Sequence, residues 1–497
     1  MKILLIYPEF PETFWSFTRA LKFVSKKSAI PPLGLLTVAS MLPDDWEITL
    51  IDMNVNHLKK RSLDGVDYVF ISAMSVQRQS ALDVIEFCDR EGVKVVAGGP
   101  LFTTSYMDIP GVDHFVLNEA EITLPQFIRD VNNGIPRHLY MSGNWADVTK
   151  TPLPDLKLLK TKKYASMSLQ YTRGCPFNCD FCDITLLYGR KVRIKKTQQV
   201  IQELENIYSM GWRQNVFFVD DNFIGNRQIL KNETLPAIAE WMRKKNHPFS
   251  FNTQASINIA DDDELMRLMV DAGFNKVFVG IETPNEESLA ECSKIQNKGR
   301  DMVACVKKIQ NFGMEVQGGF IVGFDSDPKT IFDDQIRFIQ KSGIVTAMVG
   351  LLEALKGTDL YKRLENENRL LGEETGDNTD CSINFIPKMD LKELVEGYKR
   401  IVSTIYTPKY YYFRIRDFLK EYNPQGSGRN FFRFKPVHIL TLFKTTFFLG
   451  IIGKERLYYW KLMLWTIFRH PGFFPVATTL AIYGFHHRKV SERYVAG

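Results

Sequence analysis

Three cysteines within eight residues are the part of this sequence best suited to chemistry. Cys175, Cys179 and Cys182 have C-x3-C-x2-C spacing inside segment 171–183. Three thiolates this close can bind one metal centre with little loss of loop entropy. A closed structural zinc site needs four ligands, and the next candidate downstream is as far away as His247. The spacing therefore predicts a metal centre with one open coordination position, where a substrate or cofactor binds.

This segment resembles the cluster loop of the radical S-adenosylmethionine (SAM) enzymes, including the aromatic Phe181 before the last cysteine. The resemblance implies a [4Fe-4S] cluster on Cys175, Cys179 and Cys182, with SAM chelated to the fourth iron and its adenine against Phe181. One electron would then split SAM into methionine and a 5′-deoxyadenosyl radical. We expect an external one-electron reductant of flavodoxin or ferredoxin type. The alternative from the motif alone is a metal knuckle or three buried thiols.

The cysteine segment begins a series of six strand-like runs that alternate with helical segments. This pattern predicts a partial (β/α)6 barrel over residues 165–352, with its chemistry at the C-terminal strand ends. The first run delivers the cysteine loop at its own C-terminal end. The runs are 165–171, 215–219, 249–254, 276–281, 315–322 and 346–351.

Polar residues and glycines recur at the ends of these runs. By the same resemblance, Asp221 lies near the SAM amino group, while Gln254 and Glu282 face the ribose or methionine. The residues implied in SAM binding are Phe181, Asp221, Gln254, Glu282, Gly319, Ile321 and Gly323. The last three belong to an adenine-contacting run, which departs from the family pattern at Asp325. Taken singly, a carboxylate at a strand end is more often a cap or a solvated charge, but the recurrence favours a site.

Arg190, Arg193 and Lys195 follow the cysteines. They either neutralise SAM or cluster charge, or form a solvated face.

Residues 1–134 alternate apolar runs with helical segments, which predicts a Rossmann-like, doubly wound parallel sheet. This region resembles the cobalamin-binding domain of one radical SAM subclass. The matching features are the run that holds Pro32 and Gly34, the acidic strand end at Asp52, and the turn at Gly98 and Gly99. The Asp-x-His-x-x-Gly signature is absent, so cobalamin would bind without a histidine ligand. A purely structural Rossmann-like domain stays open as the alternative.

The 497 residues suffice for about three domains. We expect a linker at 135–164, a helical domain at 353–430, and a basic, apolar and aromatic tail at 431–497. The net charge is +6, yet residues 431–490 hold nine Lys or Arg against one acidic residue. That pairing of charge with apolar content favours a membrane surface, and we predict no nucleic-acid partner.

The tail has three apolar stretches, none with the roughly 18–20 uncharged residues of a spanning helix. It is either an interfacial anchor or a helical cap on the barrel. The cysteine usage fits a reducing compartment, so we expect a cytoplasmic protein that is peripheral on the inner face of the membrane.

The order of domains resembles that of the cobalamin-dependent radical SAM enzymes. Within that family, the sequence is most similar in appearance to the branch that contains the hopanoid C-2 methylase. This implies a radical SAM enzyme that uses the cluster, SAM and cobalamin to methylate an unactivated carbon, with a lipid as the expected substrate. The alternatives are radical cyclisation or carbon–carbon coupling of lipid chains without methyl transfer, modification of a soluble natural-product precursor, and a non-catalytic iron–sulfur or corrin-binding protein.

Overall fold

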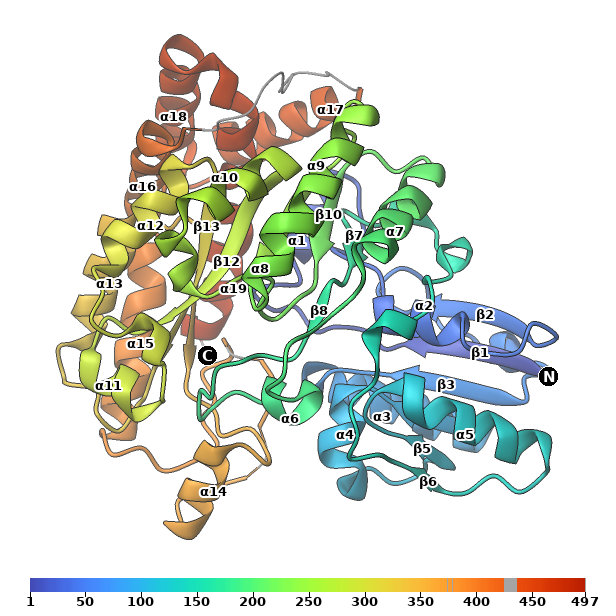
Figure 1. The fold of residues 1–497 in the computed structure, drawn as a ribbon. Helices are drawn as coiled ribbons and strands as arrows, with labels where there is room; N and C mark the ends of the chain where they lie inside the picture. Colours follow the sequence, from blue (N-terminus) through green and yellow to red (C-terminus); the bar gives the residue numbers. More distant parts are fainter. Residues whose placement is uncertain (373, 378, 424–435, 497) are drawn as a thin grey trace.

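The computed structural model describes residues 1–372, 374–377, 379–423 and 436–496 (Figure 1). Within these residues, two six-stranded sheets follow one another along the chain, and a helical region completes it. Every neighbouring pair of strands in the two large sheets is parallel. The predicted class is confirmed: a Rossmann-like sheet, a partial barrel and a helical C-terminal region.

The N-terminal sheet has the strand order β2-β1-β3-β4-β5-β6. Its strands are β1 (Lys2–Tyr7), β2 (Glu47–Asp52), β3 (Tyr68–Ser72), β4 (Lys94–Gly98), β5 (His114–Val116) and β6 (Leu139–Tyr140). The last of these lies inside the segment predicted as a linker and pairs with β5. Two residues are too few to give an apolar run in the sequence, so this strand has no sequence signature.

Both faces of the N-terminal sheet are covered, because successive side chains of a strand point to opposite faces. Ile3 and Leu5 face α2 (Leu33–Ala39) and α5 (Ala120–Asn132) in one apolar core. Leu4 and Ile6 face α3 (Arg78–Arg90) and α4 (Pro100–Ser105) in the other. This is the doubly wound arrangement, and it leaves the C-terminal strand ends free of helices from either layer.

The second sheet has the order β14-β13-β12-β11-β10-β7, with β7 and β14 at its edges. Its strands are β7 (Met167–Leu169), β10 (Asn215–Phe218), β11 (Ser250–Gln254), β12 (Phe274–Glu282), β13 (Glu315–Val322) and β14 (Ala347–Leu351). The helices between them are α7 (Thr197–Ser209), α8 (Arg227–Ile229), α9 (Leu235–Lys244), α10 (Asp263–Ala272), α11 (Glu286–Glu291), α12 (Met302–Asn311) and α13 (Ile331–Ser342). This is the expected partial barrel.

The face of the barrel sheet that lies away from α9, α10 and α12 is covered by segments near the two ends of the chain. Lys276 of β12 places its Nζ 5.2 Å from the ring centroid of Tyr483, which belongs to α19 (Phe474–Ala496). Near the N-terminus, the Trp15 indole donates a hydrogen bond to Met348 Sδ at 2.8 Å. Figure 1 shows α19 behind β12 and β13, on the side away from α9, α10 and α12. The tail therefore packs on the barrel through α19.

The remaining helices are α1 (Thr18–Leu21), α6 (Ile184–Tyr188), α14 (Asp359–Asn366), α15 (Leu391–Ile405), α16 (Pro408–Glu421), α17 (Pro436–Thr445), the π-helical segment η10 (Thr446–Ile451) and α18 (Arg456–Arg469). The predicted boundary between helical domain and tail, at 430–431, lies outside the described residues. Among those described, no helix combines the length and the hydropathy needed to cross a membrane.

Candidate functional site

The cysteine loop is fixed at its base by a two-stranded hairpin. β8 (Thr172–Arg173) pairs antiparallel with β9 (Arg193–Ile194), and the loop between them ends in α6. Gly174 has a φ of +88°, and a Cβ there would lie 2.7 Å from the carbonyl oxygen of Lys191. Because backbone cannot yield as a flexible side chain can, only glycine fits at this position. The Cys175 N–H then donates to the Gly189 carbonyl at 3.2 Å, which closes the loop.

All three loop cysteines are free thiols of intermediate burial. Burial raises the pKa of each thiol, and the neighbouring Cys179 raises those of Cys175 and Cys182 further. Lys294 is the nearby cation that opposes this shift in all three. Three thiolates at this spacing therefore need added positive charge, as an iron–sulfur cluster supplies. In the described part of the chain, no three or more His, Cys, Asp or Glu side chains are arranged to hold a single metal ion.

An ion-pair cluster joins the cysteine loop to the N-terminal domain. Arg173 Nη1 lies 2.9 Å from Glu119 Oε1, and Arg173 Nη2 lies 2.7 Å from Glu121. Arg193 reaches the same Glu119 carboxylate at 2.8 Å. The Glu119 side chain is only 2% exposed. Because Glu119 follows β5 and Arg173 precedes the cysteines, the C-terminal edge of one sheet is held against the cluster loop of the other.

The three cations after the cysteines have partners within the protein. Arg193 pairs with Glu119 and buried Lys195 pairs with Glu203, while Arg190 donates to Asn178. Glu119 lies 74 residues from Arg193, so the spacing of the cations could not indicate this pair. The other two partners are nearer, eight residues from Lys195 and twelve from Arg190.

Two adjacent carboxyl groups follow β10 and have different surroundings. Asp220 is fully buried and accepts hydrogen bonds from the backbone N–H groups of Tyr171 and Thr172, so it positions the strand that enters the cysteine loop. Burial and, to a smaller extent, the carboxylates of Asp220 and Asp183 together raise the pKa of Asp221 to about 7. The structure therefore brings Asp183, directly after the last loop cysteine, close enough to the predicted Asp221 for their charges to interact.

Glu282 ends β12 in a strained conformation. Its φ is +62°, at a register shift where β12 pairs with β13. Its Oε1 lies 2.5 Å from Lys294 Nζ. Burial alone would lower the pKa of Lys294. The Glu282 carboxylate outweighs this effect and raises that pKa above its ordinary value. Since Lys294 also lies near the thiols, this pair places one fixed cation beside the cysteine loop. Non-glycine residues held in this backbone region concentrate at functional sites.

The predicted adenine-contacting residues come together. Phe181 and Ile321 pack against one apolar cluster that includes Phe324, and the Phe181 and Phe324 ring centroids are 6.3 Å apart. A Cβ at Gly319 would lie 2.8 Å from the end of the Phe278 ring, so a larger residue there would displace that ring. Gly323 has a φ of +109°.

Two further residues of the barrel can be placed. Gln254 is half-buried at the end of β11. Asp325 turns away from this group: Arg369 Nη2 lies 2.6 Å and Arg363 Nη1 2.9 Å from its carboxylate. Burial opposes the effect, but these arginines lower the pKa of Asp325 to about 2. Asp325 therefore joins the barrel to the helical region.

In the N-terminal domain, the residues predicted to bind cobalamin lie at or beside the C-terminal strand ends, but several have partners within the protein. Asp52 is buried and accepts a hydrogen bond from Tyr164 Oη at 2.8 Å. Pro32 precedes α2, and a Cβ at Gly34 would meet nothing within 4 Å. A Cβ at Gly98 would lie 2.6 Å from the Val116 carbonyl oxygen, and one at Gly99 2.5 Å from Ser72 Oγ. Both glycines are thus required by close packing of the chain on itself.

The C-terminal edge of the N-terminal sheet faces the cysteine loop. Figure 1 shows β1 and β3 directed toward α6, which follows the cysteines and lies between the two sheets. Met74, just after β3, is 49% exposed at this edge. His114 lies at the opposite edge, where its Nδ1 is 2.7 Å from the Arg137 carbonyl oxygen. His114 is therefore not placed to ligate a cofactor bound at the C-terminal edge.

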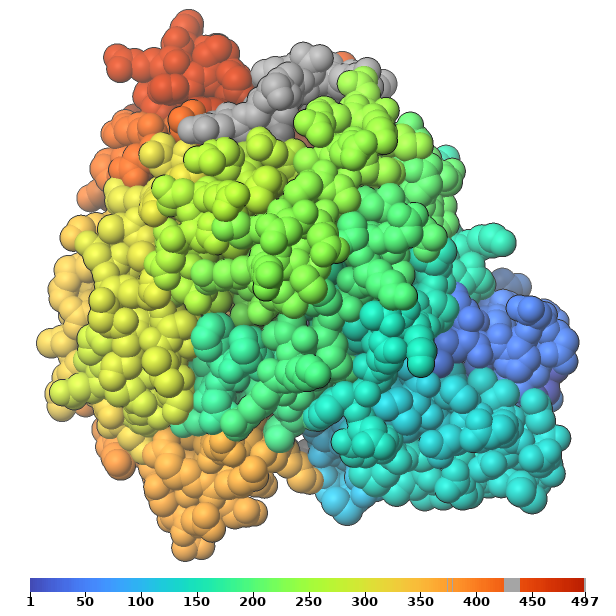
Figure 2. All heavy atoms as spheres, in the orientation of Figure 1, coloured from blue at the N-terminus to red at the C-terminus, as the bar shows by residue number. Residues whose placement is uncertain are grey.

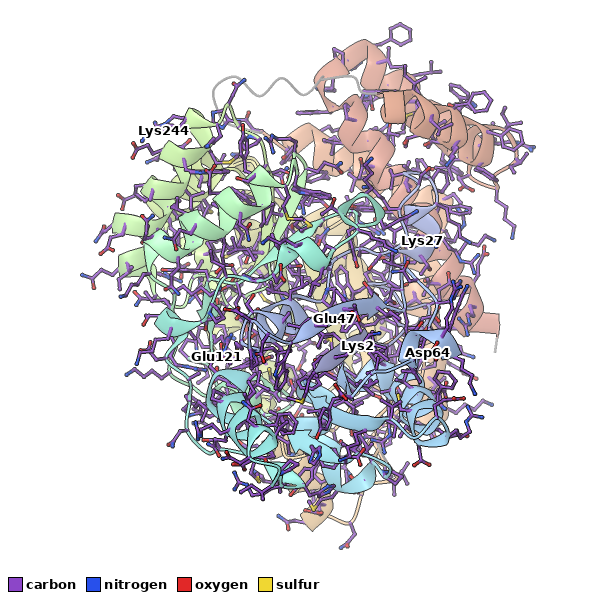
Figure 3. The ribbon with its side chains drawn as sticks, turned by 90° about the vertical axis from the view of Figure 1, so that its right-hand side faces the viewer. Lys2, Lys27, Glu47, Asp64, Glu121 and Lys244 are labelled. Carbon is purple, nitrogen blue, oxygen red and sulfur yellow. The ribbon has the colours of Figure 1, made fainter. Side chains whose placement is uncertain are left out.

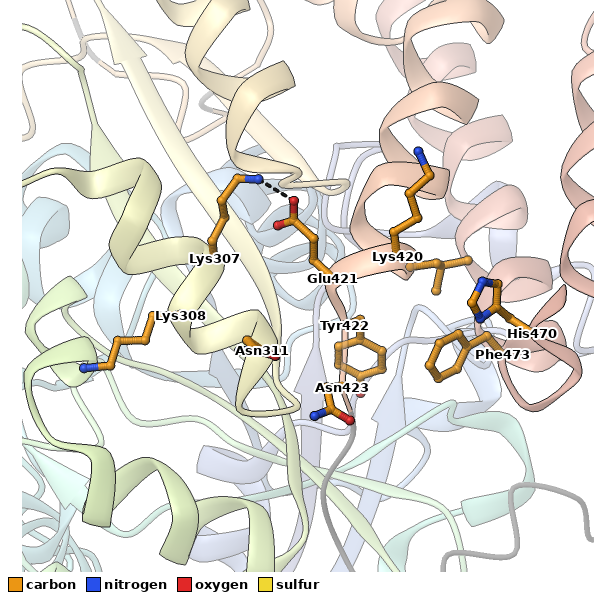
Figure 4. Close-up of a pocket in the computed structure, with 10 residues that line it drawn as sticks. Lys307, Lys308, Asn311, Lys420, Glu421, Tyr422, Asn423, His470 and Phe473 are labelled. Carbon is orange, nitrogen blue, oxygen red and sulfur yellow. Dashed lines mark hydrogen bonds and ion pairs between the residues drawn. The ribbon is translucent and has the colours of Figure 1, made fainter.

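A cavity of about 670 Å³ lies elsewhere, between α12 and α16. Lys307 and Glu421 form an ion pair of 2.6 Å beside it (Figure 4). The end of α12 precedes β13, so this cavity lies at the N-terminal strand ends, away from the cysteines. It borders residues that the structure does not describe, and we assign it no part in the site.

Three protein families match consecutive parts of the chain. The B12 binding domain matches residues 23–128, the Radical SAM superfamily 169–339, and a domain of unknown function, DUF4070, 358–497. The first match covers β2 to β5 of the N-terminal sheet, and the second covers β10 to β13 of the barrel sheet. The fold and the three-cysteine loop thus define a radical SAM enzyme with a B12-binding domain.

Relatives extend over most of the chain. An uncharacterized methyltransferase of Synechocystis sp. is 44% identical over 84% of this chain and 79% of its own length. The hopanoid C-2 methylase of Rhodopseudomonas palustris is 31% identical over 94% and 90%. The chain therefore belongs to the cobalamin-dependent radical SAM methyltransferases, whose cofactors are a [4Fe-4S] cluster, SAM and cobalamin.

Solved structures share the fold. The cobalamin-dependent SAM radical enzyme OxsB has a TM-score of 0.63 and 14% identity, covering 100% of this chain and 80% of its own. The radical SAM methyltransferase TsrM from Kitasatospora setae has a TM-score of 0.57 and 13% identity, with coverage of 74% and 78%.

Proposed function

We propose that this enzyme methylates an unactivated carbon of a lipid. The observation that carries the proposal is the alignment of nearly the whole chain, tail included, with the hopanoid C-2 methylase, an enzyme named for a lipid product. The exposed apolar side chains of Met74 and of Leu186 on α6 support it, since both lie at the junction of the two sheets. Methyl transfer, which the relatives share by name, takes precedence over cyclisation or coupling.

The overall reaction converts a C–H bond of the lipid into a C–CH3 bond. Two molecules of SAM and two electrons are consumed. The hydrogen leaves on 5′-deoxyadenosine with methionine as the other fragment, and the second SAM yields the methyl group and S-adenosylhomocysteine. The cluster supplies the electron that cleaves SAM, and cobalamin carries the methyl group. The two electrons come from an external one-electron reductant of flavodoxin or ferredoxin type.

The roles of the residues follow from their placement. Cys175, Cys179 and Cys182 ligate the cluster, and Phe181 with Ile321 forms the apolar surface for the SAM adenine. The polar parts of SAM face Asp221, Gln254 and Glu282, with Gly319 and Gly323 shaping the adjoining strand end. Cobalamin lies on the edge formed by the ends of β1, β3 and β4. The free state of all described cysteines supports a reducing, cytoplasmic location.

Lipid extracts from cells with and without this protein test the proposal. We expect a lipid that is heavier by one CH2 group only when the protein is present. A lipid lighter by two hydrogen atoms would mean cyclisation. An unchanged lipid pool together with a methylated water-soluble product would assign the enzyme to a soluble precursor.

A further inference from the structure

The segment formed by α17, η10 and α18 is firmly attached to the protein through its inner side. Leu449, Tyr459 and Leu462 are buried in the main apolar core. Glu455, 1% exposed at its side chain, pairs with Arg488 of α19 at 2.8 Å. Lys444 Nζ donates to the Lys22 carbonyl at 3.0 Å. The outer side of these helices therefore has a defined orientation.

That outer side is apolar over its whole length. Twelve large apolar side chains between residues 439 and 469 are exposed. Phe443 is 71%, Leu457 69% and Phe468 81% exposed. The others are Ile439, Leu440, Phe447, Phe448, Ile451, Ile452, Trp460, Leu464 and Ile467. Figure 2 shows α18 standing out as a lobe at the upper left, and Figure 3 shows rings projecting from these helices at the upper right.

Helices that are apolar on all sides are found buried or in lipid. Contiguous exposed apolar patches of this kind are rare on soluble monomers and mark interaction sites. We name this outer side, residues 439–469 of α17, η10 and α18, the apolar lobe.

The exposed charged residues of the apolar lobe are all basic. Its only other exposed residues are Lys454, Arg456, Lys461 and Arg469, and its only acidic residue is the buried Glu455. A two-fold contact between copies would bring the same patch, with the same cations, onto itself. An anionic bilayer instead accepts the aromatic and aliphatic side chains at its interface and pairs its headgroups with the basic ones.

We propose that the apolar lobe docks onto an anionic phospholipid bilayer, with α17 and α18 lying in the plane of the interface. The proposal is independent of the reaction, although docking brings the methylation site to a membrane lipid. It also accounts for both interpretations of the tail, since α19 packs on the barrel while α17 and α18 face outward.

Flotation of the full-length holoenzyme with lipid vesicles tests this docking. Vesicles of phosphatidylcholine with phosphatidylglycerol should carry the protein, and added salt should weaken its binding. The variant Phe443→Ser/Leu457→Ser/Phe468→Ser should bind at least about tenfold more weakly. The matched control Ile135→Ser/Met141→Ser, exposed on the N-terminal domain, should bind as the wild type does. Thermal unfolding of both variants confirms that they fold.

A second variant separates charge from apolar contact. Arg456→Gln/Lys461→Gln/Arg469→Gln should lose roughly fivefold in affinity per charge on the anionic vesicles and little on phosphatidylcholine alone. The proposal is overturned if wild type does not float, if the folded serine variant floats equally, or if that variant only changes the oligomeric state. Flotation requires no turnover, so a failure to find methylated lipid would leave this result standing.

Discussion

Arg173 and Glu119 form an ion pair of 2.9 Å that connects the residue two positions before Cys175 to the end of a strand in the B12-binding domain. The pair is largely buried, with side-chain exposures of 12% and 2%. It fixes the cysteine loop relative to the edge on which we place cobalamin. If cobalamin binds at that edge as proposed, these side chains and the fold together would set the distance between the two cofactors.

Removing the shared carboxylate should uncouple the two domains. Glu119→Gln leaves Arg173 and Arg193 without their common anion, and breaking a buried pair costs roughly 3–5 kcal/mol. We expect a free energy of unfolding in urea lowered by about that amount, and more 5′-deoxyadenosine formed per methyl group transferred. Glu396→Gln on α15, whose pair with Lys392 is exposed, is the control. A free energy of unfolding equal to that of the control variant would refute the role of Glu119.

Each loop cysteine should be required for the cluster. Cys175→Ser, Cys179→Ser and Cys182→Ser should each lose most of the bound iron and the visible absorption of the reconstituted protein, because a serine hydroxyl is a poor ligand for iron. Cys305→Ser on α12 should retain both, since Cys305 lies outside the loop. Full iron content in any loop variant would show that the cluster has another ligand.

The backbone at Gly174 should tolerate no side chain. Gly174→Ala combines a positive φ with a contact of 2.7 Å to a carbonyl oxygen, and strained backbone of this kind costs about 1–3 kcal/mol before the contact is counted. We expect a lower melting temperature and poor cluster incorporation, measured as iron per protein. Gly34→Ala is the matched control, because a Cβ there meets nothing within 4 Å. If Gly34 approaches the corrin closely, this control should keep its iron but bind cobalamin more weakly.

Glu353 should make stability depend on pH. Burial raises the pKa of Glu353 from 4.5 to about 7. The folded protein thus holds this proton more tightly than the unfolded chain, and the free energy of unfolding falls as the pH rises through that window. Glu353→Gln keeps the acceptor for Thr375 and removes the charge. Its stability relative to wild type should increase between about pH 5 and pH 8 by up to about 3 kcal/mol, measured by urea unfolding. A constant difference would contradict the raised pKa.

Local patterns sufficed to predict much of this architecture. Buried strands such as Lys2–Tyr7 give a continuous apolar run, so their positions could be predicted closely. The cysteine loop has its ligands within one short segment and could be recognised without the fold. Phe181 and Ile321 were expected to share a ligand, and the structure brings them into one cluster.

Long-range pairs could not be predicted. Arg173 is 54 residues from Glu119, and Tyr164 is 112 residues from Asp52. A single sequence does not show that these residues pair, because each side chain alone is compatible with a solvated charge or hydroxyl. The same holds for Asp325, whose arginine partners come from the helical region. For the tail, the structure shows α19 packed on the barrel, whereas membrane docking by α17 and α18 remains our proposal.

One measurement addresses the central claim directly. The reconstituted holoenzyme, with cobalamin, a one-electron reductant and SAM carrying a deuterated methyl group, is incubated with membrane lipid. We predict that 5′-deoxyadenosine and S-adenosylhomocysteine form in equal amounts, and that a lipid gains the labelled methyl group. Formation of 5′-deoxyadenosine with neither S-adenosylhomocysteine nor label in any lipid would contradict radical methylation of a lipid.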